Sequence, residues 1–346
     1  MNAIDEAIRV IPADWFEPSP VVYWSDLLLS AGSGWTTFVL AVRAEGWTRA
    51  ALLVVSIGAL YRAVLFIHET THRSSRDLPA FTVAWNVLVG VPLLIPSFLY
   101  EGVHLDHHRA RSYGTPADPE YVPFGRRTPL LMSTFVLGSL VAPFALALRF
   151  GLLAPLTWIV PPLRRPIEKR FSSLVINHAY VRRAAIGRSG RTTEAAACAV
   201  VWLSLWATWS GVLPLSFLGC WAVASATAFG VNAIRTLAAH RYDHDAGELS
   251  MTEQLLDSCT IQPTRGWRSL AGHVVDAGRA LVAPVGLRYH ALHHWIPSLP
   301  YHRLGRAHRL LVATLRGDAP YRATIEHGFL GAFRDLLGRA AARARA

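Results

Sequence analysis

The feature that most constrains this chain is a series of apolar blocks, each approaching the length that a lipid bilayer demands. A helix needs about 20 mostly apolar residues to cross the hydrocarbon core. Hydrophobic residues make up 52% of the 346 and charged residues only 16%, whereas soluble domains carry about 25% charged residues. The blocks cover residues 27–42, 48–67, 81–100, 130–160, 195–210 and 212–235. The sequence therefore predicts an all-α integral membrane protein.

Some of these blocks contain residues that interrupt a helix. Block 27–42 is short, and serine and glycine residues at 30–34 should break it. Pro92 and Pro96 lie in block 81–100 and predict a re-entrant or interfacial hairpin instead of a clean crossing. Block 130–160 is broken at Pro143 and marked by Arg149, so it should cross an even number of times or lie at the interface. We expect about four transmembrane helices plus interfacial or re-entrant helices, in a single domain of residues 1–346 with a core at about 27–310.

The charge of +11 comes almost wholly from arginine, because Lys169 is the only lysine. These cations lie between apolar blocks and are dense at residues 163–193, which is typical of cytoplasmic loops under the positive-inside rule. That distribution argues against nucleic acid as a partner. We expect the basic tail, residues 311–346, to form an amphipathic helix on anionic headgroups, or to dock an acidic electron carrier.

Two further features concern the termini and the thiols. The first twenty residues carry acids where a signal peptide needs a basic region, so no cleaved signal is predicted. Cys198, Cys220 and Cys259 form no C-x-x-C motif. We expect them to be buried thiols that ligate no metal.

The histidines fall into clusters with helical spacing. Of the fifteen, eight lie in the three motifs HETTH, HLDHH and HALHH. Residues at i, i+3 and i+4 share one face of a helix, and imidazole is a favoured ligand of iron and zinc. The eight are His68, His72, His104, His107, His108, His290, His293 and His294. The sequence therefore predicts a metal site.

The number of histidines distinguishes an iron site from a zinc site. The motif H-E-x-x-H at His68–His72 is also that of zinc proteases, but a catalytic zinc takes three protein ligands. Eight clustered histidines suit two ions with open positions for oxygen better. A zinc peptidase would also need a later ligand, for which Asp257 is a weak candidate. Glu69 is then interpreted as a carboxylate that accepts an N–H from a ligand imidazole and fixes its tautomer.

Other acidic residues flank the clusters. Glu101 and Asp106 beside the second cluster either cap helices or support a ligand from behind. Asp118 and Glu120 are interpreted mainly as turn residues, with a supporting role as the alternative. We interpret Tyr289 and Trp295 beside the third cluster as packing or interface aromatics.

In their order and between these apolar blocks, the three motifs resemble the histidine boxes of the membrane-bound fatty acid desaturase superfamily. The segments HHRARSYGTPADPEY and HALHHWIPSLPYHRLGRAHRLL also read like acyl-lipid desaturases. The resemblance covers about residues 27–309. It implies two iron ions, O2 as co-substrate, and histidine boxes on the cytoplasmic side of four transmembrane helices. It also implies one further ligand beyond the last helix, which we place at His240 and not at His244.

The chain departs from the superfamily at some positions. Thr236 stands where members can have an asparagine that holds a metal-bound water, and Asn232 is a weaker substitute. His290 replaces the glutamine of front-end desaturases, and no cytochrome b5 segment is evident. Electrons should therefore come from a separate ferredoxin, rubredoxin or cytochrome b5 type protein. The implied activity is desaturation of an acyl lipid or acyl thioester in the membrane. A hydroxylase or carotenoid ketolase of the same superfamily is the alternative, and the zinc peptidase is a weaker one.

Overall fold

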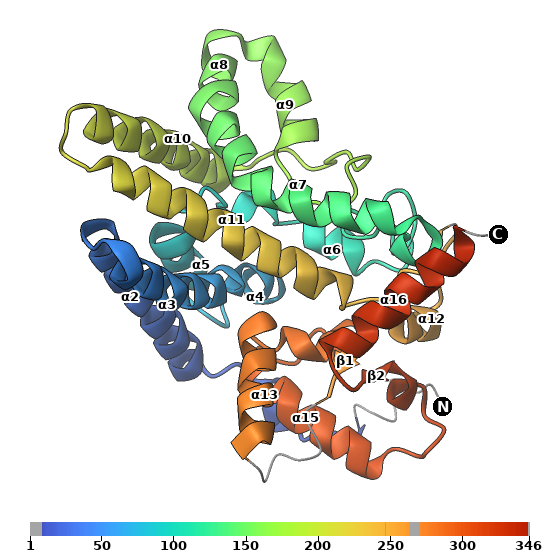
Figure 1. Ribbon diagram of the computed structural model, residues 1–346. Helices are drawn as coiled ribbons and strands as arrows, with labels where there is room; N and C mark the ends of the chain where they lie inside the picture. Colours follow the sequence, from blue (N-terminus) through green and yellow to red (C-terminus); the bar gives the residue numbers. More distant parts are fainter. Residues whose placement is uncertain (1–8, 246, 263–269, 345–346) are drawn as a thin grey trace. The chain divides into compact units, whose positions relative to one another are not determined.

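A computed structural model describes residues 9–245, 247–262 and 270–344 of the chain. The described part is mostly helical, as expected, with one pair of very short strands (Figure 1). The chain divides into two compact units, each assembled from separated segments. Unit 1 comprises Met1–Pro20, Asp106–Phe135 and Asn232–Ala346, and unit 2 comprises Val21–Leu105 and Val136–Val231. The first residues of the acidic N-terminus and the last two of the basic tail lie outside the described residues.

Unit 2 contains three long helices and several short ones. Its α-helices are α2 (Pro20–Arg43), α3 (Gly46–Val64), α4 (Phe66–His72), α5 (Phe81–Trp85), α8 (Ala154–Ile159), α9 (Arg164–Phe171) and α10 (Arg188–Trp209). π-turns lie at Asn86–Gly90 and Arg149–Leu153, and 3-10 turns at Ser97–Leu99 and Pro161–Leu163. Helix α2 begins with the last residue of the first segment of unit 1, and three further helices cross a unit boundary, namely α6 (Val103–His107), α7 (Pro129–Leu148) and α11 (Leu215–Leu237).

Unit 1 consists of shorter helices around a two-stranded parallel sheet. Its helices are α12 (Met251–Asp257), α13 (Leu270–Val282), α14 (His290–Trp295), α15 (Tyr301–Thr314) and α16 (Phe329–Arg343). Strands β1 (Thr260–Ile261) and β2 (Ile325–Glu326) pair Thr260 with Ile325 and Ile261 with Glu326. 3-10 turns lie at Ala13–Phe16, Phe124–Arg126, Leu287–Tyr289 and Pro320–Thr324. Tyr289 and Trp295 are buried in an apolar core with α15, as packing residues.

Among the described residues, three helical runs are long and apolar enough to cross a membrane: Gly46–His72, Pro129–Ile159 and Leu215–Leu237. Large apolar side chains such as Leu137, Phe144 and Leu203 are exposed on the long helices, as lipid-facing positions would be. Helices α2 and α10 have 24 and 22 residues, but they are not in this apolar set. That the chain crosses the membrane four times stays a prediction. That the histidine boxes face the cytoplasm stays a prediction too.

Two expected helix breaks do not occur. Helix α2 continues through residues 30–34, and the small residues there serve packing instead. Ser56 of α3 donates a 2.9 Å hydrogen bond to the Gly34 carbonyl, and a Cβ at Gly34 would lie 2.8 Å from Leu60. Small residues allow such close approach of helices in membranes. Pro143 likewise lies inside α7 without ending it, so the run Pro129–Ile159 is continuous.

The expected interruption of block 81–100 is confirmed. The helix that begins at Phe81 ends at Gly90, before Pro92, and is too short to span a bilayer. The buried state expected for Cys198, Cys220 and Cys259 is confirmed, and all three are free thiols. The expected C-terminal helix forms as α16, whereas its contact with headgroups or an electron carrier remains a prediction.

A buried ion pair joins the helices of unit 2. The Arg149 guanidinium lies 2.5 Å from the Glu194 carboxylate, with both side chains at most 4% exposed. Arg149 also donates to the Ser172 hydroxyl, and Arg164 donates 2.9 Å to the second Glu194 oxygen. Burying a charge is costly unless it is paired and hydrogen-bonded. The arginine that marked this block in the sequence is therefore an internal connection between α9, α10 and the run Pro129–Ile159.

We predict that Glu194→Met lowers the free energy of unfolding by about 3–5 kcal/mol, because it leaves the Arg149 charge buried without its partner. The double variant Arg149→Met/Glu194→Met should recover most of this loss. Unfolding of the purified protein in detergent measures both. The control is Asp318→Ala, which removes a surface pair with Arg316 and should cost less than about 1 kcal/mol. Equal effects of Glu194→Met and Asp318→Ala would contradict the prediction.

Candidate metal centre

Four histidines of unit 1 converge on one point. His107 ends α6, His240 follows α11, and His290 and His294 lie one turn apart on α14. All four are at most 6% exposed, and their ligand atoms lie within 4.8 Å of one another. The His290 Nε2 atom lies 2.8 Å from His240 Nε2 and 3.1 Å from His294 Nε2. We call these four residues the histidine quartet.

The quartet fits a metal ion by the chemistry and spacing of its donors. Two imidazole nitrogens bound at about 2.1 Å and at right angles to one ion would lie about 3.0 Å apart. The two Nε2–Nε2 separations at His290 bracket that value. Burial lowers the pKa of His294, and the neighbouring imidazoles of His108 and His290 lower it further. A neutral imidazole is the form that binds a metal.

Backbone hydrogen bonds fix the positions of His240 and His290 relative to one another. The Cys259 N–H donates to the Ala239 carbonyl at 2.8 Å, and the Ala291 N–H donates to the Cys259 carbonyl at 3.0 Å. Residue His240 also forms an isolated antiparallel bridge with Ser258. The extended segment that follows α12 therefore lies between the two ligand segments and links them through paired backbone groups.

Asp118 supports His107 from behind. Both Asp118 carboxylate oxygens lie 2.9 Å from His107 Nδ1, and the carboxylate also accepts the backbone N–H groups of Gly114 and Glu120. Burial would lower the pKa of His107, but the Asp118 carboxylate outweighs it and raises the pKa. An Nδ1–H donated to Asp118 leaves Nε2 free to ligate. The sequence pattern suggested mainly a turn here, with this role as the alternative.

A second buried carboxylate supports His240 through a tyrosine. The Tyr113 hydroxyl donates to Asp257 at 2.9 Å and lies 2.8 Å from His240 Nδ1. Because that hydroxyl donates to Asp257, it accepts the Nδ1–H of His240, and Nε2 is again free. Tyr121 donates to the other Asp257 oxygen at 3.1 Å. Burial would raise the pKa of Asp257, but the hydrogen bonds that its carboxylate accepts outweigh burial and lower the pKa.

Sequence reasoning missed this arrangement. Asp257 was considered only as a ligand of a zinc peptidase, and Tyr113 and Tyr121 were not singled out. Tyr113 and Asp257 lie 144 positions apart, so no local spacing relates them. The available signal was chemical: a carboxyl group between apolar residues in a chain with few acids.

His108 and His293 form a second pair in unit 1. Their Nε2 atoms lie 3.1 Å apart, and the rings cross at 90°. His293 is buried and His108 half-buried. The spacing of the two nitrogens is again that of neighbouring ligands on one ion.

Unit 2 contributes a third group, formed by His68 and His72 of α4 and His104 of α6. The ring centroids lie 4.5 Å apart for His68 and His104, 4.9 Å for His72 and His104, and 5.1 Å for His68 and His72. The Tyr100 hydroxyl lies 2.9 Å from His104 Nδ1. The structure thus places three predicted ligands in unit 2 and six in unit 1. That all nine share one centre remains a prediction.

The remaining candidates lie as follows. Glu69 is buried, accepts a hydrogen bond from Tyr23, and lies 3.8 Å from His68 Nδ1, which exceeds a hydrogen-bond distance. Asp106 forms an ion pair with Arg109. The Thr236 hydroxyl accepts from Arg235, as does the Asn232 side-chain oxygen.

Histidines outside the predicted set have other roles or are exposed. His244 donates from Nε2 to the Gly247 carbonyl at 3.1 Å, and it is not a member of the quartet. His308 is buried and lies 2.8 Å from the Tyr321 hydroxyl. His178, His273 and His327 are exposed.

Comparison with known proteins agrees with the geometry. Residues 45–325 match the fatty acid desaturase family, so the chain belongs to that family. It is also 41% identical over 335 residues to a ceramide hydroxylase of Caulobacter vibrioides, covering 94% of this chain and 91% of that protein. No solved structure matches the chain. The family and the three apolar helical runs make this a membrane oxidoreductase.

We predict that Asp118→Asn weakens metal binding about 10–100-fold, because the carboxylate that orients His107 and raises its basicity is lost. Competition with a chelator, followed by metal analysis, measures the change. Asp335→Asn on the exposed face of α16 is the matched control and should bind metal normally. If both variants bind metal like the unmodified protein, Asp118 has no role in holding it.

Proposed function

We propose that the protein is an O2-dependent di-iron hydroxylase that acts on a ceramide or a closely related membrane lipid. The observation that carries this proposal is the 41% identity to a ceramide hydroxylase over nearly the full length of both chains. The quartet supports it, since a histidine-rich centre with open positions suits oxygen chemistry. The family assignment leaves the zinc peptidase without support.

The reaction would convert one C–H bond of a hydrocarbon chain into C–OH. One oxygen atom of O2 enters the lipid, and the other leaves as water with two protons and two electrons. The bound iron would supply the activation of O2. The protein's own residues hold Nε2 atoms toward the metal, keep protons on Nδ1 of His107 and His240, and exclude water by burial.

Under this proposal the quartet holds one iron. His108 and His293 would hold the other, together with His68, His72 and His104. Support comes from the donor chemistry of each group and from the 3.1 Å spacing of the His108 and His293 nitrogens. The short interval in the chain between His104 and His107 also favours a shared centre.

The partners follow from the same chemistry. The electrons require a separate donor of ferredoxin, rubredoxin or cytochrome b5 type. The net charge of +11 favours an acidic carrier, because opposite charges raise the rate of encounter. The dense arginines at 163–193 favour histidine boxes that face the cytoplasm.

Desaturation of an acyl chain is the second candidate, and the name of the family favours it. It would remove hydrogen atoms from two adjacent carbons and release both oxygen atoms as water. A carotenoid ketolase, the other alternative from the sequence, receives no support from the relative. The product distinguishes hydroxylation from desaturation.

We predict that lipids from a host expressing this protein contain a ceramide with one added oxygen atom, and that His293→Ala abolishes it by removing a proposed ligand. Mass spectrometry of extracted lipids measures the product. His178→Ala, at an exposed site, is the control and should retain activity. A product that lacks two hydrogens and gains no oxygen would establish the desaturase instead.

We also predict about two iron atoms per chain in the purified protein and little zinc, as the paired histidine groups would bind two ions. Elemental analysis measures this directly. Removal of iron by a chelator should abolish activity, and iron with a reductant should restore it. A content of one zinc and no iron would contradict a di-iron centre.

A further inference from the structure

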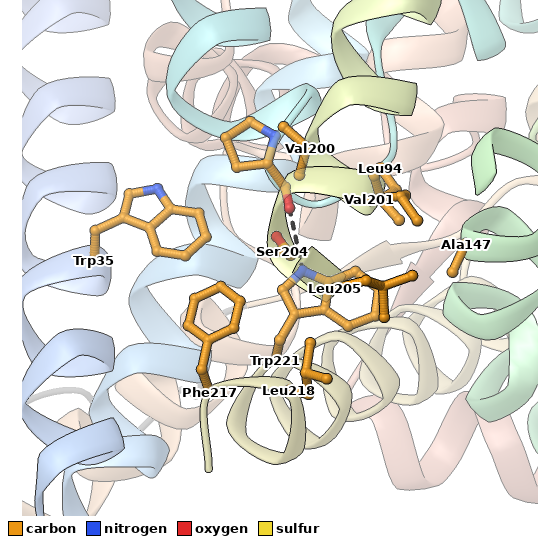
Figure 2. A pocket seen from close by; sticks show the side chains of 11 residues that line it. Trp35, Leu94, Ala147, Val200, Val201, Ser204, Leu205, Phe217, Leu218 and Trp221 are labelled. Carbon is orange, nitrogen blue, oxygen red and sulfur yellow. Dashed lines mark hydrogen bonds between the residues drawn. The ribbon is translucent and has the colours of Figure 1, made fainter. Parts of the chain in front are cut away.

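Unit 2 contains an apolar cavity of about 330 Å³. It lies between α2, α7, α10, α11 and the turn after Gly90, and Figure 2 shows the side chains that line it. The wall includes Leu94, Val201, Leu205 and Phe217, and the Ser204 hydroxyl is one of its few polar groups. The volume lies at the low end of ligand pockets, which span about 300–1,000 Å³.

Two tryptophans of the wall are oriented by the broken helix. An α-helical carbonyl bonds the N–H four residues later, but proline has no N–H. An α-helix continued through this segment would pair the carbonyls of Leu88 and Pro92 with N–H groups at positions 92 and 96, but both positions are prolines. The Trp35 indole N–H donates to the Leu88 carbonyl at 2.7 Å. The Trp221 indole N–H donates to the Pro92 carbonyl at 3.1 Å, as Figure 2 shows. With both N–H groups used in this way, the rings contribute apolar surface to the cavity.

The surroundings determine what such a cavity can hold. Ala147, Phe217 and Trp221 belong to two runs that are apolar and long enough to span a membrane. Leu205 is 45% exposed at the wall, while Trp202 and Leu203 on the same helix are exposed and apolar. Water needs two to four polar partners, and the wall offers few. An empty void loses dispersion contacts, so the chemistry of the site suits a hydrocarbon chain.

A ceramide has two hydrocarbon chains, and only one of them can present the carbon that reacts. None of the nine predicted ligand histidines is among the residues that line this cavity, and we propose that it binds the non-reacting chain of the two-chain lipid substrate. The inference rests on the proposed function for the identity of the lipid. Because hydrocarbon surrounds the helices in any case, hydrophobic transfer gives little selectivity. Shape and contact within the cavity would select the chain instead.

Binding can be tested without turnover by photo-crosslinking in bilayer nanodiscs. The probes are a ceramide and a phosphatidylcholine that each carry a diazirine on one alkyl chain, and peptide mass spectrometry locates the adducts. We expect the ceramide probe to label residues 200–205, with displacement by unlabelled ceramide and not by phosphatidylcholine. Equal labelling and displacement by phosphatidylcholine would mean that a bystander lipid fills the cavity, which overturns the proposal. An absence of label at 200–205 would also overturn it.

Activity gives a second and separable readout. Ser204→Phe fills the cavity and Leu205→Trp narrows its wall, whereas Leu203→Trp on the lipid-facing side of α10 is the matched control. For ceramide with two long chains, we expect the two cavity variants to raise KM about tenfold or more with kcat changed less than about twofold. A ceramide whose non-oxidised chain is truncated should lose this discrimination, so that each cavity variant and the unmodified protein handle it alike, whereas truncation of the oxidised chain alone should preserve it.

The outcomes separate the two proposals. Equal losses on long and truncated ceramides, or no loss on either, would overturn the binding role of the cavity while the hydroxylase stands. If the unmodified protein forms no hydroxylated ceramide, the proposed function fails, and the crosslinking result still decides whether the cavity selects a ceramide chain. Unfolding measured in detergent and the iron content show whether each variant has folded. If Ser204→Phe has not folded, Leu205→Trp alone tests the cavity.

Discussion

The quartet depends on one constraint: an imidazole directs Nε2 inward only when its Nδ1–H is held from behind. Asp118 does this for His107, and Asp257 does it for His240 through Tyr113. Buried carboxylates are costly unless hydrogen-bonded. Asp118 therefore also takes two backbone N–H groups. Helix α12 begins with a capping box at Ser250 and ends at Asp257, so a short helix with a defined start places this carboxylate.

The same requirement for partners explains unit 2. Hydrocarbon offers no hydrogen bonds, so each polar group within the apolar helices must find its partner in the protein. The indole N–H groups of Trp35 and Trp221 donate to the backbone carbonyls of Leu88 and Pro92. The Glu194 carboxylate forms an ion pair with Arg149. Each partner comes from a different helix. These polar contacts consequently fix how the helices pack. Apolar contacts alone would specify that packing less uniquely.

How much of the fold and of the candidate metal centre can be predicted depends on whether a feature is local in the sequence. The ligand spacing, the break before Pro92 and the choice of His240 over His244 follow from periodicity, proline chemistry and family resemblance. Tyr113, Asp257 and Trp221 act through contacts with residues 127–144 positions away, so no local pattern points to them. Two local rules also misled. Pro143 lies within α7, where tertiary context outweighs its helix-breaking tendency, and the small residues at 30–34 allow close packing of α2 and α3.

The family contains proteins named as desaturases, and a relative of this chain is named as a hydroxylase. One family thus accompanies both names, so membership of the family alone does not select the outcome. Both reactions require a C–H bond of one carbon to be presented to the metal, and they differ in whether the neighbouring carbon also reacts. A cavity that holds the other chain of the same lipid would limit how far the reacting chain can slide, and would thereby couple substrate selection to the position that is oxidised.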